Sequence, residues 1–316
     1  MKTALVTGAA GLVGRHMCAA LAAAGWWVTG VDVAPGPDNG TMRNWTHGGV
    51  DCREVFKANE TYELIAHCAA TVGGREMIEG APLTIAANLG LDAAMFAWAA
   101  RTKPEHVIYF SSSAAYPVAL QRDRGHRLAE DDIDLTDVHL PDEVYGWAKL
   151  TGEMLAAKAR AAGVNVHVLR PFSGYASDQS SSYPFPAFLA RAIAHDDPFL
   201  IWGSGEQTRD WVHMDDVVAT ALEMVRRNHP GPLNVGHGVA TTFAQLAGLM
   251  AREVGYRPGL ERRRDAPVGV QHRVCNPSRL HALRRPEITL LTGIRRCLAE
   301  LAAPATTPAS QPTVHR

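Results

Sequence analysis

The chain has 316 residues, and its 31 lysines and arginines nearly balance its 32 aspartates and glutamates, which leaves a formal net charge of −1. This balance removes the electrostatic reason to expect a dedicated nucleic-acid-binding or membrane-surface protein. With 47% hydrophobic and 20% charged residues, the chain can bury a large core, either as one large fold or as two joined lobes.

No run approaches the ~18 consecutive apolar residues of a membrane span, and no cleavable leader precedes the first apolar stretch, so we expect a cytoplasmic protein. Five cysteines contain no C-x-x-C pair, which argues against a disulfide framework and against a zinc site. We therefore expect no bound metal.

The N-terminal residues predict a β-α-β unit. Thr3–Thr7 reads as a short buried strand, the glycine turn GAAGLVG follows, and an alanine- and leucine-rich helix runs to Gly25. The apolar run WWVTGVDV then gives a second strand. Because a helix connects the two strands, we expect them to be parallel and the crossover to be right-handed.

The alternation of strands and helices continues along the chain. Residues 64–68, 106–111 and 164–169 are strand-like, whereas 83–101 and 143–162 are helical. Together they predict an α/β fold with a Rossmann-like, doubly wound parallel sheet over residues 1–170.

Beyond Pro171 the sequence changes to short aromatic and proline-rich pieces, with helices near 215–227 and 242–254. We expect a smaller α+β substrate lobe over residues 171–302, with some exchange of chain back to the sheet. Residues 303–316, rich in proline, threonine and alanine, predict a disordered tail.

Three glycines, Gly8, Gly11 and Gly14, lie between the first strand and its helix with the spacing G-x-x-G-x-x-G. Such glycines let a backbone approach a pyrophosphate at a helix N-terminus, although a tight turn alone can require them for steric reasons. Asp32 ends the second strand, where a carboxylate receives ribose hydroxyls. Because the following VAPGPDNG contains no arginine or lysine for a 2′-phosphate, the pattern favours NAD over NADP.

Tyr145 and Lys149 stand four residues apart on a predicted helix, so they project from one face. A tyrosine, with an ordinary pKa of ~10, is a poor base at neutral pH, and a nearby ammonium favours its phenolate. The pair predicts a general acid–base. Ser111, Ser112 and Ser113 follow a strand at the carboxyl edge of the sheet, where a serine can hydrogen-bond a substrate hydroxyl.

These motifs resemble the extended short-chain dehydrogenase/reductase family, in particular its nucleotide-sugar epimerase/dehydratase branch. The resemblance runs from about Lys2 to about Arg296. The segments that carry it are TGAAGLVG, Asp32, GVDC, HCAA, YFSSSAAYP, YGWAK, LRPFSGY and WGSGEQTRDWVHMDDV.

The resemblance implies further contacts to NAD. It places Asp51 and Cys52 near the adenine, the turn after residue 67 near the ribose and phosphates, and Pro171 and Ser173 beside the nicotinamide. Ser173 stands where the family often has asparagine. The residues expected to bind NAD are Gly8, Gly11, Leu12, Val13, Gly14, Asp32, Val33, Asp51, Cys52, Cys68, Ala69, Ala70, Ser111, Tyr145, Lys149, Pro171 and Ser173.

The resemblance also implies a nucleotide-diphosphate sugar as substrate and a homodimer formed through the two long helices. Arg209 would clamp the phosphates, Trp202 would pack on the base, and Arg273 would be a second phosphate contact. A surface arginine, a core tryptophan and a salt-bridged arginine are the respective alternatives. The residues expected to bind the substrate are Thr71, Ser112, Ser113, Tyr145, Trp202, Arg209 and Arg273.

The residues after the catalytic serine bear on the reaction. Counting back from Tyr116-Pro117 places the catalytic serine hydroxyl at Ser112, which is followed by Ser113 and Ala114. Family dehydratases carry an Asp-Glu pair at those two positions, and 3,5-epimerases usually carry a cysteine at the second; both are missing here.

The remaining chemistry needs only NAD, Tyr145, Lys149 and Ser112, and we expect an epimerase that acts at C4 through a transient 4-keto sugar. Three alternatives stay open. They are a net sugar-nucleotide dehydrogenase or reductase, a dehydratase or 3,5-epimerase with unusual acid–base residues, and a non-catalytic NAD-sensing protein.

Overall fold

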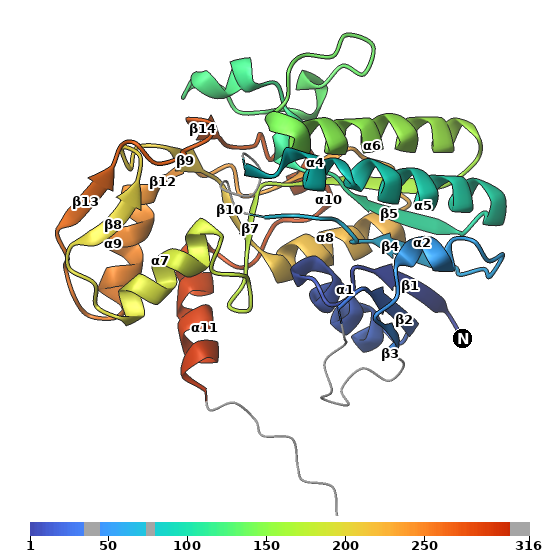
Figure 1. Cartoon of the computed structure of the whole chain (residues 1–316), viewed down its shortest axis with the longest axis horizontal. Coiled ribbons are helices and arrows are strands. Elements are labelled where there is room, and N and C mark those ends of the chain that lie inside the picture. Colours follow the sequence, from blue (N-terminus) through green and yellow to red (C-terminus); the bar gives the residue numbers. More distant parts are fainter. Residues whose placement is uncertain (35–44, 74–79, 304–316) are drawn as a thin grey trace, which may run out of the picture.

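The computed structural model describes residues 1–34, 45–73 and 80–303. Its centre is a seven-stranded sheet in the order β11-β6-β5-β4-β1-β2-β3, and all of its pairings are parallel (Figure 1). The strands are β1 (Thr3–Thr7), β2 (Trp27–Asp32), β3 (Trp45–Gly48), β4 (Leu64–His67), β5 (His106–Phe110), β6 (Val166–Pro171) and β11 (Leu233–Val235). This order confirms the predicted doubly wound α/β fold.

Helices cover both faces of the sheet (Figure 1). On one face lie α1 (Leu12–Ala23) and α8 (Met214–Arg226). On the other lie α2 (Cys52–Val55), α4 (Pro82–Ala86), α5 (Asn88–Thr102) and α6 (Glu143–Ala161).

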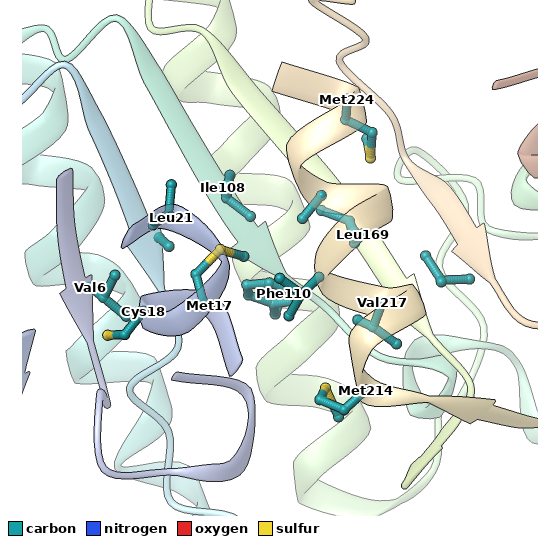
Figure 2. Close-up of a cluster of buried hydrophobic side chains, with 14 of the residues drawn as sticks. Val6, Met17, Cys18, Leu21, Ile108, Phe110, Leu169, Met214, Val217 and Met224 are labelled. Carbon is teal, nitrogen blue, oxygen red and sulfur yellow. The ribbon is translucent and has the colours of Figure 1, made fainter. Parts of the chain in front are cut away.

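Alternation along the strands explains the two layers. Val6, Ile108 and Phe110 point to α1 and α8, whereas Leu5 and Tyr109 point to α5 and α6. Figure 2 shows the first cluster, in which methionines and small apolar side chains of α1 and α8 meet the sheet. Because both faces are buried, the strands read as nearly continuous apolar runs.

The helix predicted over residues 83–101 is wrong in one respect: it is two helices, α4 and α5, separated by a turn at Ala87. The buried amide of Asn88 receives a hydrogen bond from Thr71 N at 2.6 Å and donates to Thr71 O at 2.9 Å. Asn88 therefore anchors the start of α5 to the loop after β4. By length and composition alone, this pair of helices is apolar enough to cross a membrane, as core helices can be.

A buried ion pair joins α6 to β6. Glu153 and Arg170 make two hydrogen bonds, 2.6 and 2.9 Å long, and Arg170 also donates to the hydroxyl of Tyr116 at 3.0 Å. Tyr116 in turn donates to Asn234 on β11 at 2.6 Å. Every member is under 5% exposed, so this buried network links α6 through β6 to β11 at the edge of the sheet.

A separate apolar core, called the second lobe below, is formed by residues beyond Pro171, among them Phe185, Phe199, Trp211, Met250 and Ile294. Its main elements are α7 (Pro184–Ile193), β8 (Phe199–Trp202), α9 (Phe243–Glu253), β13 (Leu260–Arg263) and α11 (Leu290–Ala302). Shorter elements, in this lobe and elsewhere in the chain, are η1 (Ser113–Ala115), η2 (Val118–Arg122), η3 (Glu130–Asp132), β7 (Ser173–Tyr175), β9 (Thr208–Arg209), β10 (Trp211–His213), β12 (Thr241–Thr242), β14 (His272–Arg273) and α10 (Ser278–Leu283).

The division of the chain near Pro171 stays a prediction. Elements beyond that residue, among them α8, α10 and β11, lie in the layers of the sheet rather than in the lobe core. The predicted tail, apart from Ala303, lies outside the described residues.

Candidate active site

The glycine turn between β1 and α1 is built by close backbone approach. Gly8 has φ +66°, and a Cβ there would lie 2.6 Å from Ala69 N. A Cβ on Gly14 would lie 2.1 Å from Gly8 O. Both positions therefore exclude larger residues, because α1 and the turn after β4 pack directly on the Gly8 backbone.

The same turn fits a dinucleotide. Gly11 caps α1 without a side-chain hydrogen bond, and the first helical turn contains no acidic residue, so the positive end of the helix can meet a pyrophosphate. Beside it, the two carboxylate oxygens of Asp32 accept from Ala10 N and Ala34 N, each at 2.9 Å. This places a carboxylate next to the turn, where ribose hydroxyls bind in the fold.

The remaining residues predicted around the adenosine lie near this edge. Val50 N donates to Asp32 O at 3.0 Å, which brings the segment with Asp51 beside the end of β2. Asp51 caps α2, and the hydrogen bond from Arg53 lowers the pKa of its carboxyl. Cys52 is buried, whereas the turn of Cys68, Ala69 and Ala70 is half-buried.

Tyr145 and Lys149 lie in the first turns of α6. Lys149 is 5% exposed; its Nζ donates to Phe110 O at 2.8 Å and lies 6.0 Å from the ring centroid of Tyr145. The half-buried Tyr145 thus has a fixed ammonium below it. A buried lysine held by a carbonyl is a positioned charge rather than a mobile surface group.

The helix also contacts the serine turn. Asp142 N donates to Ala114 O at 3.0 Å, and a Cβ on Gly146 would lie 2.4 Å from the same oxygen. The residues flanking Tyr145 are therefore packed against the turn that follows β5. The sequence-predicted pair and the predicted serine come from elements that touch.

The three serines differ in their surroundings. Ser111 is buried and donates to Glu153 Oε1, so its side chain belongs to the core network, and its backbone N donates to Leu169 O at 2.8 Å. Ser113 is also buried. Ser112 is half-buried and its Oγ accepts from Ala114 N at 3.1 Å, which leaves its hydroxyl proton for another acceptor.

The residues predicted beside the nicotinamide lie where the chain leaves the sheet. Pro171 pairs in register with Val235, and Ser173 N donates to Asp210 O at 2.9 Å. Thr71 is fixed by Asn88, as described above. Among the described residues, no cluster of His, Cys, Asp and Glu could hold a metal ion.

The two predicted phosphate ligands are neighbours: Arg209 on β9 and Arg273 on β14 pair in parallel register. The Arg209 guanidinium lies 5.3 Å from the ring centroid of Phe243. Arg273 forms a largely buried ion pair with Asp142 at 2.7 Å and donates to Gln121 at 2.6 Å. Arg273 thus makes the salt bridge of the alternative interpretation, and its contact with a phosphate stays a prediction.

Trp202 ends β8 with 39% of its surface exposed, so it is not a core tryptophan. Arg263 of β13 is its cross-strand partner. Sequence reasoning missed two buried residues near Lys149, Asp92 and Tyr109. Their signal was an acid on the buried face of an apolar helix and a tyrosine inside a central strand.

A family model described as the NAD dependent epimerase/dehydratase family matches residues 4–236. The chain belongs to this family. The finding confirms the resemblance seen in the sequence and the expectation of NAD as cofactor. The family includes both epimerases and dehydratases, so membership does not decide which of these reactions the protein catalyses.

Relatives within the family carry out different reactions. A dTDP-4-dehydro-6-deoxy-D-allose reductase of a Streptomyces species is 27% identical over 299 residues, which cover 88% of this chain and 89% of the relative. GDP-L-fucose synthase of Escherichia coli is 26% identical over 268 residues, or 78% and 82% of the two chains. UDP-glucose 4-epimerase of Thermus thermophilus, solved with NAD, has the same fold, with a TM-score of 0.79, 22% identity and coverage of 94% and 98%.

Proposed function

We propose that the protein is an NAD-dependent epimerase that inverts C4 of a nucleotide-diphosphate sugar and regenerates its cofactor in each cycle. The observation that carries the proposal is the packing of the Tyr145 and Lys149 helix against the Ser112 turn. The next two residues, Ser113 and Ala114, have neither a carboxylate nor a thiol.

The proposed chemistry follows from these side chains. Tyr145 takes the proton of the C4 hydroxyl as general base and returns it later as general acid. Lys149, held on Phe110 O, stabilises the phenolate, while Ser112 hydrogen-bonds the same sugar oxygen. When bound, NAD supplies the hydride acceptor and donor for C4. Because Ser113 and Ala114 cannot titrate, no proton is moved at the neighbouring carbons.

We propose that the second lobe holds the nucleotide. Arg209 would bind the diphosphate, since a guanidinium matches two phosphate oxygens. The exposed face of Trp202 would stack on the base. Arg273 would join the phosphates only by exchanging its ion pair with Asp142, so we assign it the weaker share of binding.

A net reductase is the second candidate, because two relatives named above are a reductase and a synthase. The two candidates differ in the fate of the cofactor. A reductase consumes one reduced nicotinamide for each product, whereas a 4-epimerase returns it. With purified enzyme, NAD and a panel of sugar nucleotides, we expect a C4 epimer by NMR and no accumulating absorbance of NADH.

The decisive variant is Tyr145→Phe. It removes the base but keeps the ring, so we expect kcat to fall by about 10² to 10⁴-fold. Tyr256→Phe, in the second lobe, is the matched control and should retain parental activity. Full epimerisation by Tyr145→Phe would refute the mechanism, and solvent deuterium in the sugar carbons of the product would indicate dehydratase or 5-epimerase chemistry instead.

The proposal includes a homodimer formed by α5 and α6. Three large apolar side chains on these adjacent helices are solvent-exposed in the monomer, namely Leu89, Trp147 and Met154. Exposed apolar side chains of this size on neighbouring elements are typical of a protein–protein contact.

A further inference from the structure

A line of buried polar groups lies beneath Lys149. The ring centroid of Tyr109 lies 5.3 Å from Lys149 Nζ, and the Tyr109 hydroxyl donates to Asp92 Oδ2 at 2.6 Å. The other carboxylate oxygen lies 3.3 Å from His67 Nε2, and His67 Nδ1 lies 2.8 Å from Thr7 Oγ1. Asp92, Tyr109 and His67 are at most 2% exposed.

Helix α6 packs closely against these buried polar groups at Gly152. Gly152 follows Lys149 by about one turn of α6, and a Cβ there would lie 1.7 Å from the Tyr109 hydroxyl oxygen and 2.7 Å from Asp92 Oδ2. A glycine inside a helix costs about 1 kcal/mol relative to alanine. Glycine nevertheless occupies position 152, because α6 has no space for a larger residue next to the Tyr109–Asp92 hydrogen bond.

A buried carboxylate needs compensation, because removing it from water is costly. Burial opposes the charge of Asp92, but the hydrogen bond with His67 and the charge of Lys149 outweigh it, so the pKa of Asp92 lies below its usual value. Burial together with the charge of Asp92 raises the pKa of Tyr109, which therefore stays a neutral donor. The attraction is mutual: an ionised Asp92 favours the Lys149 ammonium.

Tyr109 lies between these two charges. Its hydroxyl is bonded to the anion and its ring lies near the cation, and donation to a carboxylate makes a phenol ring more electron-rich. A second carboxylate near this region, Glu153 of α6, is already paired with Arg170. Asp92 is thus the acid positioned to act on Lys149.

We propose that Asp92 is a positioning residue that, through Tyr109, keeps the Lys149 ammonium charged and in place for Tyr145. The titratable groups around this ammonium are Asp92 from α5, Cys68 from the turn after β4, Tyr109 from β5, and Tyr145 and Glu153 from α6. The inference deepens the proposed function, since it assigns Lys149 the role of supporting Tyr145. The placement of the ammonium itself can be tested without any reaction.

The direct test uses the protein without substrate. The chain has five lysines, so labelling lysine with ¹³C at Cε gives few signals, and Lys149→Arg identifies the one of interest. In Asp92→Asn we expect the titration midpoint of the Lys149 signal to lie below that of the parent, because a neighbouring anion is lost. The ring-current shift imposed by Tyr109 should also weaken. Asp134→Asn, on an exposed loop, is the control and should leave both unchanged.

Tyr109→Phe gives a second test that does not depend on the folding of Asp92→Asn. It keeps the ring but removes one of the donors that favour the ionised Asp92, so the Lys149 midpoint should fall in the same direction by a smaller amount. An unchanged midpoint and ring-current shift in folded Asp92→Asn or Tyr109→Phe would overturn the proposal.

Kinetics separate this inference from the proposed reaction. In Asp92→Asn we expect the alkaline limb of the kcat profile to move to lower pH while the KM for the sugar nucleotide stays within about twofold. A purely structural role would lower activity evenly across pH, and that result would contradict the positioning role. If the NMR signals change as expected but the parent epimerises no sugar, the positioning stands and the proposed function fails.

Discussion

Gly14 is the residue at which the cofactor turn has least room. A Cβ would lie 2.1 Å from Gly8 O and 2.7 Å from the Cα of Ala9, so Gly14→Ala must displace α1 from the turn. We expect the free energy of unfolding to fall by about 1 to 3 kcal/mol and the affinity for NAD to fall at least about tenfold. Denaturant unfolding and calorimetric titration with NAD measure the two effects.

Gly248→Ala is the control for this prediction. Gly248 is an exposed residue inside α9, and a Cβ there meets nothing within 4 Å. We expect it to leave NAD binding unchanged and to stabilise the protein by about 0.5 to 1 kcal/mol. Equal losses of stability in both variants would show that steric exclusion is not what Gly14 provides.

At the residue scale, the sequence predicted the residues whose types carry a chemical signature. Gly8, Asp32, Tyr145 and Lys149 stand at spacings that follow from a turn and from a helical face, which are local properties. Asp92 is different, because its role depends on a tyrosine of β5 and a histidine of β4, whose positions are fixed only by the sheet. No local pattern contains that information.

At the scale of elements, a charged cluster joins α1, α8 and the loop after β7. His16 Nδ1 lies 2.7 Å from Asp215 Oδ1, and its Nε2 lies 3.4 Å from Asp178 Oδ1. Burial disfavours the imidazolium, but the hydrogen bonds to the two carboxylates prevail and raise the pKa of His16 to about 9. Arg15 and Arg296 pair with the same two acids.

The sign of the pH effect follows from this cluster. The folded protein binds the His16 proton more tightly than the unfolded chain, whose histidine pKa is 6.5. The stabilisation is therefore complete below pH 6.5 and is lost as pH rises toward 9. We expect the stability difference between the parent and His16→Asn, measured by urea unfolding, to be largest near pH 6 and to shrink by pH 9.5. A constant difference would exclude the charge as its source.

The strands of the central sheet that the sequence missed are short. β3 has four residues and β11 has three, too few for a periodic pattern, and both exist because a neighbouring strand supplies hydrogen bonds. The break at Ala87 was missed for a related reason, since alanine-rich sequence favours an uninterrupted helix. The contact that accompanies it, between Asn88 and Thr71, is not local.

At the scale of the whole molecule, the proposed homodimer gives a prediction about surface residues. Trp147 and Met154 on α6 are 43% and 39% exposed. We expect Trp147→Glu combined with Met154→Arg to convert a dimer to a monomer in sedimentation velocity. Val239→Glu, in which an exposed apolar residue of the second lobe is replaced, should leave the dimer intact. A parent that sediments as a monomer would refute the proposed assembly.

The position of β11 has a consequence for how the protein can be made. This strand forms its edge of the sheet only after the chain has left β6 and passed through α7 and β8 of the second lobe. A fragment ending after β6 would expose the backbone edge of β6 that pairs with β11. It would also remove Asn234, which accepts the hydrogen bond from the Tyr116 hydroxyl that contacts the buried Arg170. Unpaired edges of this kind favour aggregation. We therefore expect residues 1–171, produced alone, to aggregate rather than to fold as an independent module.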